Sequence, residues 1–262
     1  MRVIGIDIGG TNIDIVFFDN EFFKVSTYST VKYFDEIYNL IETLISKYKA
    51  DGVGVSVAAW IKSDEFIHAP NLPKIPKLPR KINKVPILAE NDANCFALYA
   101  SHVFGVKNII GITVGTGIGS GIVINGKIYR GGGLAGEIGH WTIKNKFHKK
   151  CVCGGFNHLE CHFGGWRFEE IGGAEKLVKS GEIYRLDGFD VFCSCVANAI
   201  MLLDPEAVVF GGRIGMNLEK NRLRRGIMKY LMHGFKPRIE ILKDELAAAK
   251  GACLVVFDRL KR

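Results

Sequence analysis

The sequence predicts an α/β fold of two similar lobes with a cleft between them, because strand and helix patterns alternate and an internal repeat opens each half. Residues 4–20, IGIDIGGTNIDIVFFDN, align without a gap with residues 110–126, IGITVGTGIGSGIVING. Each copy reads as an apolar strand, a turn rich in Gly and Thr, and a second apolar strand. We therefore expect each lobe to begin with a β-hairpin, with the lobes at 1–105 and 106–262.

The other elements follow from local spacing. Apolar residues at Ile37, Leu40, Ile41, Leu44 and Ile45 have the spacing of one helical face, which predicts a helix over 35–49. In the first lobe we also expect strands at 53–57 and 85–89 and a helix over 93–104. In the second lobe we expect a helix over 189–203, a strand at 207–210 and a helix over 221–232. Turn signals at 19–20 and 125–126 end the two hairpins.

Composition excludes several classes of protein. The 262 residues are 48% hydrophobic and 24% charged, which is typical of a globular chain and excludes disorder. No apolar run is long enough to cross a membrane, and Asp7 and the glycines interrupt any signal peptide. The seven cysteines are an odd number in a long chain, which favours reduced or metal-bound thiols and a cytoplasmic protein over a disulfide framework.

The net charge of +8 favours anionic ligands, such as a nucleotide with its phosphates or a nucleic acid. The densest basic run, residues 220–225, lacks the interleaved aromatic residues that stack on bases. We interpret this run as a solvated helix face and expect no nucleic-acid partner.

The two glycine turns are candidate phosphate sites. Glycines bring backbone N–H groups to a tight bend with no Cβ in the way, and such a concavity binds anions. The candidate residues are Gly9, Gly10 and Thr11 in the first turn and Gly115, Thr116 and Gly117 in the second. Neither turn has the spacing of a Walker loop. Asp7, just before the first turn, can hold Mg²⁺ through water or simply cap the turn.

Two further polar segments follow predicted strands. Residues 90–94, ENDAN, open the helix after strand 85–89, so one of them can serve as its N-cap. A carboxylate in the same place can instead accept a proton from a substrate hydroxyl during phosphoryl transfer. Gly211 and Gly212 follow the strand at 207–210, where a flat ligand such as adenine can lie against the backbone.

A cluster of cysteines and histidines predicts a zinc site. His140, Cys151, Cys153 and His158 supply two thiolates and two imidazoles, which is a closed tetrahedral set with no open position for substrate. Cys161 is an alternative fourth ligand. The metal is therefore expected to be structural and to fix a loop that carries Glu137 and Glu160. The alternative is a loop of reduced cysteines without metal.

These motifs together resemble the ROK sugar kinases of the actin-like ATPase superfamily. The resemblance rests on DIGGTN at 7–12, PNLP at 70–73, ENDAN at 90–94, residues 114–140, CVCGGFNHLE at 151–160 and DPEAVVFGGRIG at 204–215. It implies an actin-like, ribonuclease H-like fold and an ATP-dependent kinase of a hexose or N-acetylhexosamine.

The resemblance also implies roles for single residues. Asp92 would be the catalytic base. The sugar would be bound by Asn71, Asn91, Asp92, Glu137, His140 and Glu160. The nucleotide would be bound by Asp7, Gly9, Gly10, Thr11, Asn12, Gly115, Thr116, Gly117, Gly211 and Gly212. Mg²⁺ would accompany ATP, zinc would be structural, and a homodimer is compatible with the resemblance.

Four features depart from the family pattern. His158 stands where the family has a third cysteine, and Ala58-Ala59 stands where it has Pro-Gly, which would narrow the sugar pocket. The region between Glu160 and Asp204 is short, and there is no room for an N-terminal DNA-binding domain. The alternative function is therefore a sugar- or nucleotide-binding regulator of the same family without turnover.

Overall fold

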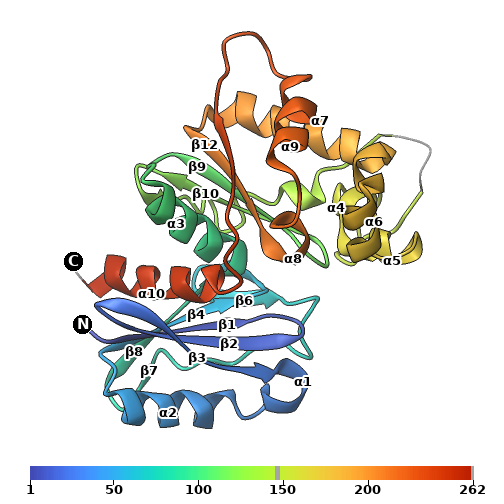
Figure 1. The fold of residues 1–262 in the computed structure, drawn as a ribbon. Coiled ribbons are helices and arrows are strands. Elements are labelled where there is room, and N and C mark those ends of the chain that lie inside the picture. Colours follow the sequence, from blue (N-terminus) through green and yellow to red (C-terminus); the bar gives the residue numbers. More distant parts are fainter. Residues whose placement is uncertain (145–147, 261–262) are drawn as a thin grey trace. The chain divides into compact units, whose positions relative to one another are not determined.

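The computed structural model describes residues 1–144 and 148–260, and its contacts divide the chain into two compact units (Figure 1). Unit 1 contains residues 1–99, the short segment Arg130–Ala135 and the chain from Leu246 onwards. Unit 2 contains residues 100–129 and 136–245. The lobes expected at 1–105 and 106–262 stay a prediction, and the contacts add the chain from Leu246 to the unit that contains the first sheet.

Unit 1 is built on a six-stranded sheet in the order β3-β2-β1-β4-β8-β7. The hairpin of β1 and β2 continues into β3, while β1, β4 and β8 run parallel to one another. The bounds are β1 Val3–Ile8, β2 Asn12–Asp19, β3 Glu21–Ser29, β4 Gly52–Val57, β7 Lys81–Ile82 and β8 Val85–Asn91, with a separate hairpin of β5 Trp60–Lys62 and β6 Glu65–His68.

The helices of unit 1 cover opposite faces of this sheet (Figure 1). Alternation along β1 decides which residue meets which helix. Ile4, Ile6 and Ile8 pack with the apolar face of α2. Val3 packs with α10 on the other face. The helices are α1 Thr30–Tyr33, α2 Ile37–Tyr48, α10 Ala247–Leu260, and α3 Asp92–Phe104, which begins in unit 1 and ends in unit 2.

Two glycines in neighbouring strands let α10 approach the sheet closely. A Cβ at Gly54 of β4 would collide with the carbonyl oxygen of Ala252, and one at Gly5 of β1 would collide with that of Ala249. Only glycine leaves room for a helix backbone there. The glycines of β1 and β4 are therefore explained by the close packing of α10 on this sheet.

Gly54→Ala is expected to destabilise the protein by about 3 kcal/mol, because α10 must move away from β4 to admit the methyl group. Thermal unfolding should show a melting temperature roughly 6 to 12 °C lower. Gly132→Ala is the matched control, since a Cβ at Gly132 meets nothing within 4 Å. Equal melting temperatures for the two variants would show that α10 does not need this glycine.

Unit 2 repeats the plan of unit 1 in its five-stranded sheet, whose order is β11-β10-β9-β12-β13. Strand β9 (Ile109–Val114) pairs antiparallel with β10 (Ile118–Ile124) and parallel with β12 (Ala207–Gly211). Since 109 − 3 and 114 − 8 both equal 106, β9 begins and ends at the residues that match the ends of β1. The predicted repeat of two hairpins is confirmed. The other strands are β11 Lys127–Ile128 and β13 Arg238–Ile241.

The core of unit 2 forms where helices cover β9 and β12. Phe163 and Phe192 are fully buried and stack with ring centroids 4.6 Å apart. The helices are α4 Glu160–Phe163, α5 Gly165–Glu170, α6 Ala174–Ser180, α7 Asp187–Leu203, α8 Gly212–Gly215 and α9 Lys220–Met228, with 3₁₀ turns η1 Ile138–His140 and η2 Glu182–Arg185. Among the described residues, no helix has both the length and the apolar character needed to span a membrane.

Candidate active site and metal centre

The first turn of α3 in unit 1 carries Asn91 and Asp92 at the carboxyl end of β8. Asn91 is the N-cap, because its Oδ1 accepts a hydrogen bond from the Asn94 backbone N–H at 3.1 Å. Its Nδ2 donates to the Ala59 carbonyl at 3.1 Å. Asp92 is therefore not needed as the cap. Its Oδ1 accepts the neighbouring Ala93 N–H at 2.9 Å, and the Asn91 side chain also forms a hydrogen bond with it.

A second carboxylate, Asp7 of β1, lies in the same electrostatic environment. Ser56 of β4 is fully buried and donates its hydroxyl to Asp7 Oδ1 at 2.5 Å. Burial raises the pKa of Asp7 to about 7, the Ser56 bond lowers it, and the nearby Asp92 charge raises it further. Burial also raises the pKa of Asp92 to about 6. Carboxyl groups with a raised pKa are typical of sites that transfer protons or bind cations.

Sequence reasoning did not identify Ser56 as part of this site. The signal was available, because Ser56 is the one hydroxyl in the otherwise apolar strand 52–57, GVGVSV. A polar side chain in the middle of a buried parallel strand needs a partner, and Asp7 is that partner.

The first glycine turn closes tightly and leaves its tip open to solvent. The Gly9 N–H donates to the Asn12 carbonyl at 2.9 Å, and the Thr30 hydroxyl donates to the Gly9 carbonyl at 2.7 Å. Gly10 has little space, since a Cβ there would lie 2.8 Å from the Asn71 carbonyl oxygen. Asn71 therefore lies against the first glycine turn. Gly10, Thr11, Asn12 and Asn71 are all exposed.

Ala59 is 2% exposed and belongs to the apolar core cluster of unit 1. Its methyl group therefore packs in the core of unit 1. Its carbonyl supports Asn91, as described above.

The second glycine turn, in unit 2, lies close to Glu160 and to the glycine pair at the end of β12. A Cβ at Gly117 would collide with Oε2 of Glu160, and a Cβ at Gly212 would lie 2.8 Å from the Val114 carbonyl oxygen. Gly212 has a φ of +76°, a conformation that favours glycine, and Gly211 pairs with Thr113 of β9. The glycine pair predicted to lie near adenosine and the second glycine turn therefore lie together in unit 2.

Four side chains in unit 2 form a compact group that can hold a metal ion. The ligand atoms of His140, Cys151, Cys153 and His158 all lie within 4.8 Å of one another. A tight turn brings the two cysteines together, since the Cys151 N–H donates to the Gly155 carbonyl and the Gly154 N–H donates back to the Cys151 carbonyl. Gly155 also makes room for the His158 ring, which a Cβ would meet at 2.6 Å or closer.

The distances within this group fit a tetrahedral ion. The Nδ1 atoms of His140 and His158 are 3.3 Å apart, Cys151 Sγ is 3.6 Å from His140 Nδ1, and Cys153 Sγ is 3.2 Å from His158 Nδ1. Tetrahedral zinc with ordinary Zn–S and Zn–N bonds separates its ligands by about 3.3 Å for two nitrogens to about 3.8 Å for two sulfurs. Cys161 is buried nearby but does not join the group found among the described residues. The predicted cluster of Cys and His is confirmed as a candidate metal site, with His158 as its fourth member.

Glu137, His140 and Glu160 gather at the edge of this metal site. Glu160 is buried, and its Oε1 lies 2.8 Å from Cys151 Sγ and 3.8 Å from His140 Nδ1. Glu137 Oε2 lies 3.7 Å from the other ring nitrogen of His140. One imidazole therefore connects the metal group to two carboxylates. In the sequence the 3₁₀ turn η1 comes first, the loop with Cys151, Cys153 and His158 follows, and α4 comes last, so the loop folds back between the two carboxylates.

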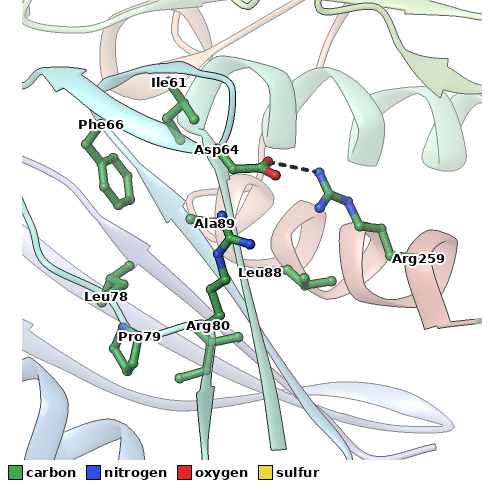
Figure 2. Close-up of a pocket in the computed structure, with 10 residues that line it drawn as sticks. Ile61, Asp64, Phe66, Leu78, Pro79, Arg80, Leu88, Ala89 and Arg259 are labelled. Atoms are coloured by element: carbon green, nitrogen blue, oxygen red, sulfur yellow. Dashed lines mark ion pairs between the residues drawn. The ribbon is translucent and has the colours of Figure 1, made fainter.

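A separate pocket of about 160 Å³ lies in unit 1 and contains none of the predicted site residues (Figure 2). Apolar side chains such as Phe66 and Leu88 line it, together with Arg80 and an ion pair of Asp64 and Arg259 at 3.6 Å. Ala89 lines this pocket, and along β8 it precedes Glu90, whose side chain points to the opposite face of the strand.

A family model described as the ROK family matches residues 3–186, which is most of the chain. The chain belongs to the ROK family. The resemblance inferred from the motifs is thereby confirmed, and the matched residues include both glycine turns, the first turn of α3 and all four members of the metal group.

Named relatives and a solved structure agree with this assignment. The chain is 28% identical to an N-acetyl-D-glucosamine kinase of Mannheimia succiniciproducens, with 88% of this chain and 91% of that one covered. It is also 28% identical to a glucokinase of Pyrobaculum calidifontis, with 97% and 94% covered. The ROK hexokinase structure from Thermus thermophilus matches with a TM-score of 0.85 and 25% identity over 100% of this chain and 99% of that one. The predicted α/β fold of this family is confirmed.

Proposed function

We propose that this protein is an ATP-dependent kinase that phosphorylates a hydroxyl group of a hexose or an N-acetylhexosamine. Membership of the ROK family and relatives named as sugar kinases support the reaction class. The single observation that carries the chemistry is Asp92, a half-buried carboxylate with a raised pKa at the first residue of α3. Its neighbour Asn91 already caps the helix, so Asp92 is available for another task.

Asp92 acts as the general base in this proposal. The sugar hydroxyl gives its proton to an Asp92 carboxylate oxygen while its own oxygen attacks the γ-phosphorus of ATP. The new O–P bond forms as the bond to the β-phosphate oxygen breaks, and ADP leaves. Mg²⁺, when bound with ATP, neutralises charge on the phosphates, and Asp7 is placed to hold it through water. Ser56 fixes the Asp7 carboxylate for that role.

The remaining predicted residues divide between the two ligands. The proposed sugar ligands besides Asp92 are Asn71, Asn91, Glu137, His140 and Glu160. The proposed nucleotide contacts are Gly9, Gly10, Thr11 and Asn12 in unit 1, and Gly115, Thr116, Gly117, Gly211 and Gly212 in unit 2. The packing of Glu160 against Gly117 and Cys151 supports its role, because a carboxylate held from two sides presents its oxygens in a fixed direction.

The proposed ion of the metal group is Zn²⁺, with His140, Cys151, Cys153 and His158 as its four ligands. Two thiolates, two imidazoles and the spacing of their ligand atoms support this choice. With four protein ligands the ion is structural. It would fix the loop next to Glu137 and Glu160, so that both carboxylates face the sugar in one arrangement.

The fall of kcat/KM at acid pH is expected to follow the protonation of Asp92. Burial raises its pKa to about 6, and a base accepts a proton only when it is ionised. The value of kcat/KM should therefore fall about tenfold per pH unit below about pH 6 and level off above it. Circular dichroism over the same pH range separates this effect from acid unfolding. A flat profile down to pH 4.5 in folded protein would contradict the assignment.

ADP production tests the function directly. Zinc-replete protein is given Mg·ATP and a panel of glucose, fructose, mannose, N-acetylglucosamine and N-acetylmannosamine. We expect ADP release that depends on one or two of these sugars, with a sugar phosphate as the second product. Folded protein that binds ATP and gives no ADP with any sugar would instead support a regulator without turnover.

The other predictions from the sequence concern the setting of this activity. We propose a cytoplasmic location for the enzyme. A homodimer and the absence of a nucleic-acid partner stay predictions of the sequence. Size-exclusion chromatography with light scattering measures the oligomeric state directly.

A further inference from the structure

The carboxylate of Glu90 is buried two residues before the proposed catalytic base. Its side chain is 5% exposed. Its Oε1 accepts the Asn91 backbone N–H at 3.0 Å and the Asn94 side-chain N–H at 3.0 Å. A buried carboxylate with this many donors is an anchor for the groups that donate to it. Here those groups belong to the turn of α3 that carries Asp92.

Arg130 supplies the positive charge that this buried carboxylate needs. Its Nε donates to Glu90 Oε2 at 2.7 Å, and one of its terminal nitrogens contacts the same oxygen. Arg130 begins the short segment Arg130–Ala135, which groups with unit 1 although the residues on either side belong to unit 2. The Gly133 and Ala135 N–H groups donate to the Arg130 carbonyl, at 2.7 and 3.2 Å, so the segment is itself a closed turn.

The bonds around Asn94 connect this ion pair to Asp92. Asn94 is buried and is held twice, by Glu90 through its side chain and by Asn91 Oδ1 through its backbone. In the sequence, Asp92 lies between Asn91 and Asn94, which this backbone hydrogen bond joins. Its side chain is held by groups of this same turn, since it accepts the Ala93 backbone N–H and forms a hydrogen bond with the Asn91 side chain. Movement of the turn therefore moves the carboxylate.

We propose that Arg130 and Glu90 are positioning residues for Asp92. The pair fixes the first turn of α3 and so fixes the direction in which the base is presented. The proposal rests on the proposed role of Asp92 as the base. A displacement of about 1 Å in a reacting group can lower a rate about a hundredfold, so loss of this anchor should affect kcat much more than ligand binding.

The first test is Arg130→Lys, which keeps the charge but replaces the guanidinium group with a single nitrogen. We expect kcat at least tenfold lower, with the KM for ATP changed by less than about twofold. The matched control is Arg259→Lys, which makes the same change in the ion pair with Asp64 in unit 1 (Figure 2). The control should keep the kcat of the unchanged protein.

Hydrogen exchange of the Asn91, Ala93 and Asn94 amides tests the same proposal without any turnover. In Arg130→Lys these amides should exchange at least about tenfold faster, and in Arg259→Lys at the original rate. This readout also separates the two proposals. If the protein phosphorylates no sugar but Arg130→Lys shows the faster exchange, the proposed function is wrong while the anchoring role of Arg130 and Glu90 is supported. An active protein with unchanged kcat and unchanged exchange in Arg130→Lys overturns the positioning role.

If Arg130→Lys does not fold, the double variant Glu90→Gln with Arg130→Met removes both charges together. We expect this variant to fold, since no unpaired charge stays buried. Its kcat should still be at least tenfold low, because no guanidinium group holds the side chain at position 90, which then no longer fixes the turn. A folded double variant with unchanged kcat and unchanged amide exchange would overturn the proposal.

Discussion

Replacement of Asp92 by asparagine is expected to lower kcat by about 10² to 10⁴-fold, the usual contribution of a general base. Asparagine keeps the size and the hydrogen-bonding oxygen of the side chain, so the bond from the Ala93 N–H survives. It cannot take a proton from the sugar hydroxyl. The loss should therefore appear in kcat, and sugar affinity measured by calorimetry should change little.

A matched control separates catalysis from general effects of charge. Asp51→Asn makes the same substitution at an exposed residue of unit 1, whose carboxylate accepts the Arg2 backbone N–H. This variant should keep its kcat. Asp92→Asn should also lose the acid limb of the pH profile, because the group that titrates near pH 6 is removed. Equal kcat for Asp92→Asn and the unchanged protein would remove Asp92 from the mechanism.

Loss of the metal is the second large effect that we expect. Cys151→Ser should lower the zinc content from about one ion per chain to near zero and lower the melting temperature by more than roughly 10 °C, because structural zinc is coupled to folding. Burial and then Glu160 raise the pKa of the Cys151 thiol, so the thiolate depends on a bound cation. Activity should fall with the zinc content, since the loop beside Glu160 loses its support.

Cys161→Ser is the matched control for the metal, with the same change at a buried cysteine outside the group of four. It should keep the zinc measured by elemental analysis. If Cys161→Ser loses the ion and Cys151→Ser keeps it, the ligand set is wrong. A chelator should reproduce the effect of Cys151→Ser in the unchanged protein.

The parts of the fold predicted from the sequence are those with a local signal. The two hairpins repeat at a spacing of 106 residues, and glycine turns and alternating apolar residues mark their strands. The helix predicted over 35–49 is found as α2, which ends at Tyr48 where Lys49 adopts the left-handed conformation. The helix predicted over 221–232 is shorter in the structure and ends at Met228.

Partners that are distant in sequence were not predictable from local patterns. The alternation of a strand does not say which helix covers it, so the return of α10 to β1 and β4 was missed. The cysteine and histidine group was predictable because its four members lie within 19 residues. Arg130 was not, because its partner Glu90 lies 40 residues earlier and a single arginine before a glycine run has no distinctive pattern.

The return of α10 to unit 1 also determines the order in which the units can fold during synthesis. The ribosome makes residues 1–99 first, then all of unit 2 together with the short segment Arg130–Ala135, and only then the helix that covers Gly5 and Gly54. Until that helix emerges, one face of β1 and β4 has no cover, and exposed strand faces are prone to aggregation. Unit 2 has its own core by then. Chains that are released before residue 246 should therefore hold a folded unit 2 and an uncovered first sheet, the state in which chaperones would bind.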